Sequence, residues 1–192
     1  GGFTLIETSL VLVLLVTLAA AFVLNLPRWS ESQMLQEGAR RFEAMIHMAR
    51  ADSANLGRRL RLAFETDPLG RRSVKLLWES DPLAAPGSFA DYAACDWKHH
   101  LPEGLVEVIS SRLTGRDAAS YLLRAPEAAK ETADETLRPI TFYPDGTCDA
   151  AVITLASRNA DDQRRALIEI DGETGIVTTR VLTSAELEEE GL

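Results

Sequence analysis

The sequence predicts an α+β protein, in which a long N-terminal helix, transmembrane in its first half and amphipathic in its second, packs on an antiparallel β-sheet head. Three observations support this fold class. Residues 8–27 form a run of 20 residues without a charge. Residues 35–56 repeat apolar or small side chains at helical intervals. The rest of the chain contains short apolar stretches separated by turn signals, as is typical of β-hairpins.

The composition excludes one broad class of function. The chain has 192 residues, which is the length of one ordinary domain with an appendage. Lys and Arg total 20 and Asp and Glu total 29, so the formal net charge is −9. Proteins that bind the phosphate backbone of nucleic acids in general depend on Lys and Arg, so we expect no such binding here.

The uncharged run has the length of a membrane span. As a helix, residues 8–27 would extend roughly 30 Å, the thickness of a hydrocarbon core. A secretory signal peptide would place a basic segment before a shorter apolar run of about 7–15 residues. Here Glu7 stands before the run, and Phe22 to Leu24 continue it beyond a small-residue stretch at 19–21. We therefore interpret the segment as a retained membrane helix.

Glu7 is the first residue that needs a special explanation. A carboxylate close to hydrocarbon costs several kcal/mol unless it is solvated or paired. Two interpretations remain open from the residue alone. Glu7 lies at the level of the lipid headgroups and is solvated, or it pairs with a cation on a neighbouring chain.

The helix pattern changes character after residue 27. Pro27 predicts a kink or a short break, and the capping-box spacing of Ser30 and Gln33 predicts a restart. The apolar stripe then follows intervals of four and three, with the charged residues Arg40, Arg41, Glu43, His47, Arg50 and Asp52 away from its centre. The stripe consists of Leu35, Ala39, Phe42, Ile46, Ala49, Ser53 and Leu56. Gly57 is the expected end of the helix.

The remaining residues predict strands and two hairpin turns. We expect strands at residues 59–65, 73–79, 105–113, 139–143, 151–155, 165–170 and 176–182. Pro144-Asp145-Gly146 and the segment 171–175 are the turn signals. Residues 80–102 contain three prolines and predict a long loop. Residues 114–136 are rich in Ala and acids, with a short helix expected around 118–124.

The N-terminal residues resemble a known processing site. Gly2-Phe3-Thr4-Leu5-Ile6-Glu7, followed directly by an uncharged helix, is similar to the cleavage site of type IV prepilins and type II secretion pseudopilins. The resemblance implies cleavage between Gly2 and Phe3 by prepilin peptidase and N-methylation of Phe3. It also implies that Glu7 meets the N-terminal amine of an adjacent subunit.

The last third of the chain extends this resemblance. Residues 140–147, 153–155, 168–170 and 174–177, together with the element Leu101-Pro102-Glu103-Gly104-Leu105, resemble the pattern of the GspH/FimT pseudopilin family. The family fold implies a sandwich-like head of antiparallel sheets. The expected organisation is a residual leader at residues 1–2, a transmembrane helix at 3–27, its amphipathic continuation at 28–57 and a periplasmic head at 58–192.

Few residues offer chemistry of another kind. Cys95 and Cys148 are the only cysteines, and a disulfide or two separate thiols are both open. His99 and His100 lack the further ligands of a tetrahedral metal site, and Asp145 and Asp171 are expected to serve their turns. The sequence contains no motif of a nucleophilic, phosphate-binding or zinc enzyme. We therefore expect a protein that is not an enzyme, with no metal and no other cofactor.

The resemblance implies a structural role in secretion. The expected function is that of a minor pseudopilin of a type II secretion system, at or near the pseudopilus tip, where it helps to export folded proteins. Its expected partners are other pseudopilins, prepilin peptidase and the lipid of the bacterial inner membrane, which it crosses once, and no small-molecule substrate is expected. Two alternatives remain: a FimT-like minor pilin of a type IV pilus, active in DNA uptake or adhesion, and a membrane-anchored β-domain without a filament.

The basic residues bear on the first of these alternatives. They include the pairs Arg58-Arg59, Arg71-Arg72 and Arg164-Arg165. Each pair carries only two charges, which is typical of a solvated strand end. The last ten residues contain four glutamates and no base, and would repel a polyanion. We therefore expect no binding of nucleic acid.

Overall fold

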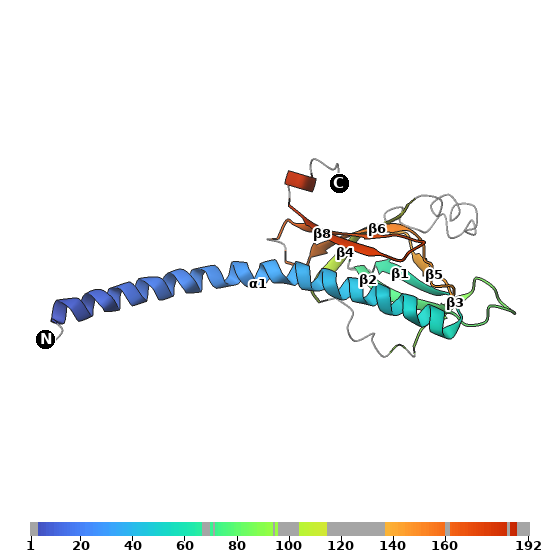
Figure 1. Ribbon diagram of the computed structural model, residues 1–192, viewed down its shortest axis with the longest axis horizontal. Coiled ribbons are helices and arrows are strands. Elements are labelled where there is room, and N and C mark those ends of the chain that lie inside the picture. Colours follow the sequence, from blue (N-terminus) through green and yellow to red (C-terminus); the bar gives the residue numbers. More distant parts are fainter. Residues whose placement is uncertain are drawn as a thin grey trace.

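The computed structural model describes residues 4–66, 70, 72–93, 95, 104–114, 137–159, 162–183 and 185–187, without the side chains of residues 21–32. It consists of one long helix and two four-stranded antiparallel sheets, so the predicted α+β class is confirmed. The N-terminal half of the helix projects from the head as a rod, and its C-terminal half lies along the sheets (Figure 1).

Helix α1 runs from Leu5 to Leu56 without interruption, over 52 residues. The break expected at Pro27 and the restart expected at Ser30 and Gln33 were wrong. A proline removes only one backbone donor, so the hydrogen bonds of the turns before and after it can carry the helix through. The end of the helix is as predicted: Gly57 adopts a left-handed conformation, with φ 62° and ψ 28°, and its N–H donates to Ser53 O.

The strands form two sheets with a clear division along the chain. The first sheet has the order β3-β2-β1-β5, and the second has the order β4-β6-β7-β8. Their bounds are β1 Leu60–Thr66, β2 Arg72–Glu79, β3 Phe89–Asp91, β4 Val106–Leu113, β5 Ile140–Phe142, β6 Ala151–Ser157, β7 Arg165–Ile170 and β8 Val177–Leu182. Seven of these eight strands coincide with predicted strands, and their ends agree to within two residues.

Strand β3 is the exception, because the sequence predicted only a loop between residues 80 and 102. Its three residues pair antiparallel with the last three residues of β2, from Leu77 to Glu79. So short a strand has no alternation of its own and depends on its neighbour for hydrogen bonds. The short helix expected around residues 118–124 lies outside the described residues.

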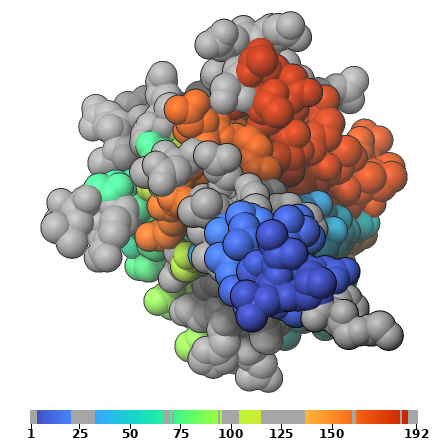
Figure 2. Space-filling model, turned by 90° about the vertical axis from the view of Figure 1, so that its left-hand side faces the viewer, coloured from blue at the N-terminus to red at the C-terminus, as the bar shows by residue number. Residues whose placement is uncertain are grey.

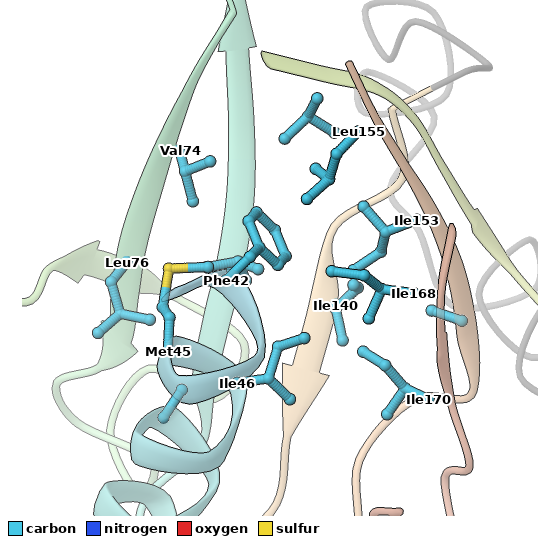
Figure 3. Close-up of a cluster of buried hydrophobic side chains, with 14 of the residues drawn as sticks. Phe42, Met45, Ile46, Val74, Leu76, Ile140, Ile153, Leu155, Ile168 and Ile170 are labelled. Carbon is cyan, nitrogen blue, oxygen red and sulfur yellow. The ribbon is translucent and has the colours of Figure 1, made fainter. Parts of the chain in front are cut away.

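The hydrophobic core lies between α1 and both sheets. Phe42, Met45 and Ile46 of α1 lie between Val74 and Leu76 of β2 on one side and apolar residues of β5, β6 and β7 on the other (Figure 3). The predicted stripe is confirmed, since its first six members are at most 1% exposed: Leu35, Ala39, Phe42, Ile46, Ala49 and Ser53. Leu56, at 42% exposed, was wrongly included.

Ser53 is the polar member of this buried face. Its hydroxyl lies 2.8 Å from Arg58 O and 3.0 Å from Phe142 O. Those carbonyls belong to the turn after α1 and to β5. A buried hydroxyl is tolerated when it has such partners, so Ser53 links the end of the helix to the first sheet.

Gly38 allows α1 to approach β4 closely. A Cβ at this position would overlap Val106 Cγ1 and lie 3.0 Å from Val106 Cγ2. Val106 is the first residue of β4 and is only 3% exposed, so its side chain has little room to move. We therefore predict that Gly38→Ala lowers the free energy of unfolding by about 1–3 kcal/mol, the usual cost of overpacking. The better helix propensity of alanine, worth about 1 kcal/mol, offsets only part of this.

Urea unfolding of the full chain in detergent, followed by circular dichroism, measures the effect. Val106→Ala provides the matched test, because it removes the atoms that the new Cβ would meet. The double variant Gly38→Ala/Val106→Ala should lose less free energy of unfolding than the sum of the losses of the two single variants. If the losses of stability of the two single variants were strictly additive, α1 and β4 would not be in contact at this point.

Candidate assembly site at the start of the helix

The first turn of α1 is built around Thr4 and Glu7. Thr4 is the N-cap residue, in an extended conformation with φ −81° and ψ 152°. Its carbonyl accepts hydrogen bonds from the N–H groups of Glu7 and Thr8, at 3.1 and 3.2 Å. Glu7 Oε2 in turn accepts a long hydrogen bond of 3.5 Å from the Thr4 N–H. The carboxylate therefore caps its own helix and also lies in the first turn, where the helix dipole favours an anion.

The sequence analysis did not predict this capping contact of Glu7. The Thr-x-x-Glu spacing of a capping box was present at residues 4–7 and could have predicted it. Glu7 is exposed, so its carboxylate remains accessible to a group from outside the chain. Gly2 and Phe3, the expected sites of cleavage and methylation, lie outside the described residues, and both assignments stay predictions.

The helix that follows Glu7 presents apolar side chains on every side. Ten large apolar residues between Leu5 and Leu18 are 48–89% exposed. Figure 1 shows that this part of α1 projects beyond the head, and Figure 2 looks onto its N-terminal end. Apolar residues all around a helix, rather than along one face, are typical of a segment buried in a larger structure or in lipid.

Among the described residues, no helix combines the length and the hydropathy that a membrane crossing requires. The transmembrane helix expected at residues 3–27 stays a prediction.

Both cysteines are buried, Cys95 at 6% and Cys148 at 5% exposed, and the disulfide between them stays a prediction. Cys148 Sγ lies 3.9 Å from Asp171 O, within the range of a weak sulfur hydrogen bond. His99 and His100 lie outside the described residues. Within the described ranges, no group of three or more His, Cys, Asp or Glu side chains could hold a metal ion.

Asp145 and Asp171 serve their turns, as expected. Asp145 Oδ1 accepts hydrogen bonds from the N–H and the hydroxyl of Thr147, at 2.9 and 2.7 Å. Asp171 Oδ1 accepts the same two bonds from Thr174, both at 2.7 Å. These bonds favour the ionised carboxylates, so the pKa of each Asp is lowered from its ordinary value.

The two turns meet the end of α1 at a cluster that we call the tip junction, formed by Arg50, Gly146, Cys148, Gly172 and Gly175. Arg50 Nε donates to Gly146 O at 2.5 Å, and a Cβ on Gly175 would overlap the guanidinium of Arg50. The Cys148 N–H donates to Gly172 O at 2.9 Å. One arginine of the helix therefore donates to the first turn and lies against the second, which the sequence did not predict because the contacts span up to 125 residues of chain. The strands on either side of the first turn, β5 and β6, belong to different sheets and do not form the expected hairpin.

The basic pairs of the sequence are engaged within the head. Arg59 donates two hydrogen bonds to Glu79, at 2.8 and 2.7 Å, and the Glu79 carboxylate also accepts from Gly87 N–H at 2.6 Å. Glu79 is only 1% exposed, whereas the side chain of Arg59 is 37% exposed, so this ion pair joins a buried carboxylate to the surface of the head. Arg58 lies over the ring of Trp78, 5.0 Å from its centre. Both arginines thus stabilise the end of β2.

Two further arginines have comparable roles. Arg72 Nη1 donates to the carbonyls of Val108 and Ile109, at 3.2 and 2.5 Å, where a bulge interrupts the pairing of β4 with β6. Arg164 pairs with Asp162 at 2.8 Å, and the hydrogen bond from Arg164 lowers the pKa of the Asp162 carboxyl. Arg71 lies outside the described residues. The described arginines of the three basic pairs therefore make contacts within the head.

Among known proteins, this chain is similar only to solved structures. No family model matches the chain, and no curated protein matches it. One structure of the minor pseudopilin EpsH from the type 2 secretion system of Vibrio cholerae is 14% identical, with a TM-score of 0.46, over 78% of this chain and 96% of that chain. A second structure of EpsH is 16% identical, with a TM-score of 0.47, over 79% and 97% of the two chains.

Proposed function

We propose that this chain is a minor pseudopilin of a type II secretion system, a structural subunit at or near the pseudopilus tip that helps to export folded proteins. The observation that carries the proposal is an exposed carboxylate, Glu7, in the first turn of α1, whose first part, residues 5–18, presents apolar side chains on all sides. The residues Gly2-Phe3-Thr4-Leu5-Ile6-Glu7, which resemble a prepilin cleavage site, support the same function.

The proposed mechanism of assembly follows from the cost of an unpaired charge. Cleavage after Gly2 would create a new N-terminal amine on Phe3, and methylation of that amine would keep its positive charge. In apolar surroundings, both the amine of one subunit and the Glu7 carboxylate of the next are costly unless they meet. Their pairing would select one axial position between neighbouring helices.

The proposal includes a location. The apolar part of α1 would cross the bacterial inner membrane once, and the C-terminal head would lie in the periplasm. The partners would be other pseudopilins, the membrane lipid and, during maturation, prepilin peptidase. The chain itself would carry out no catalysis.

We predict that Gly2→Leu in the full-length gene blocks maturation. Glycine has no side chain to obstruct a protease that acts at the membrane surface, whereas leucine adds bulk at the cleaved bond. Mass spectrometry of the purified chain measures the outcome: the natural chain should begin with methylated Phe3, and the variant should keep its leader. Gly1→Ala, one residue from the bond, is the control and should be processed. Normal shortening of Gly2→Leu would contradict the proposed processing.

The alternative, a FimT-like minor pilin, differs in its expected binding of DNA. We predict no shift of duplex DNA by the purified chain at physiological salt. The net charge is −9, and the basic residues of the described pairs contact protein groups. Electrophoresis at low and then physiological salt tests this. A complex that persists at physiological salt, and weakens in Arg164→Ala/Arg165→Ala, would favour the alternative function.

A further inference from the structure

We draw no further inference here: the strongest candidate, the outer edge of strand β8 beside the exposed side chains of Ile176 and Val181, carries none because nothing among the residues that the structure describes shows what covers it.

Discussion

On the proposed function, Glu7→Leu should abolish entry of the subunit into the filament, while the chain still inserts into the membrane and folds its head. Leucine matches the apolar residues that follow, so insertion should not suffer. The methylated amine of the neighbouring subunit would lose its counter-charge in apolar surroundings. Removal of one partner from a buried ion pair costs about 3–5 kcal/mol, which corresponds to at least a hundredfold loss of assembly. Cross-linking to the other pseudopilins in cells, compared at equal expression, measures this loss.

Two conservative variants separate the charge of Glu7 from its capping contact. Glu7→Gln keeps an acceptor for the Thr4 N–H but has no charge, and it should fail in assembly as Glu7→Leu does. Glu7→Asp keeps the charge and should retain part of the assembly. If Glu7→Gln assembled at the natural level, capping of the helix would explain the residue, and the proposed ion pair would be wrong.

Gly172→Ala should destabilise the head by about 3 kcal/mol, more than any other single methyl addition proposed above. The added Cβ would lie 2.6 Å from Cys148 O and 2.9 Å from Ala150 N. These are backbone atoms of the segment that leads into β6, which cannot turn aside as a side chain can. The substitution would also strain the hydrogen bond from Cys148 N–H to Gly172 O.

Gly104→Ala is the matched control, because beyond its chain neighbours no atom of the described residues lies within 4 Å of its added Cβ, and its backbone is not left-handed. Urea unfolding of the full chain in detergent, with circular dichroism, compares the two. A loss of stability in Gly172→Ala no greater than in Gly104→Ala would mean that the tip junction is loosely packed.

Local patterns predicted most of the fold. The stripe from Leu35 to Ser53, the stop at Gly57 and the turns at 144–146 and 171–175 depend on residues a few positions apart, where spacing carries the information. Only the second turn joins two paired strands, because β5 and β6 lie in different sheets. Pro27 was misjudged because one lost hydrogen bond weighs little in a helix of 52 residues. Strand β3 was missed because its pairing with β2, rather than its own three residues, makes it a strand.

The candidate sites also divide into those that local sequence patterns predict and those that depend on contacts between distant residues. Glu7 stands out in the sequence because a lone acid precedes an apolar run, and its capping role was also present in the spacing from Thr4. The tip junction could not be predicted, since Arg50 meets Gly146 and Gly175 only after both sheets have formed.

The continuity of α1 gives the N-terminal contact an influence on the orientation of the head. Each residue of an α-helix adds 1.5 Å of height and about 100° of rotation. In the proposed filament, a shift of one residue in the contact made by Glu7 would therefore move the head by only about 1.5 Å along the helix axis but rotate it by about 100° about that axis. Because the head packs on this same helix and Arg50 bonds one of its turns, the direction in which the head faces depends on the contact at the N-terminal end of the helix.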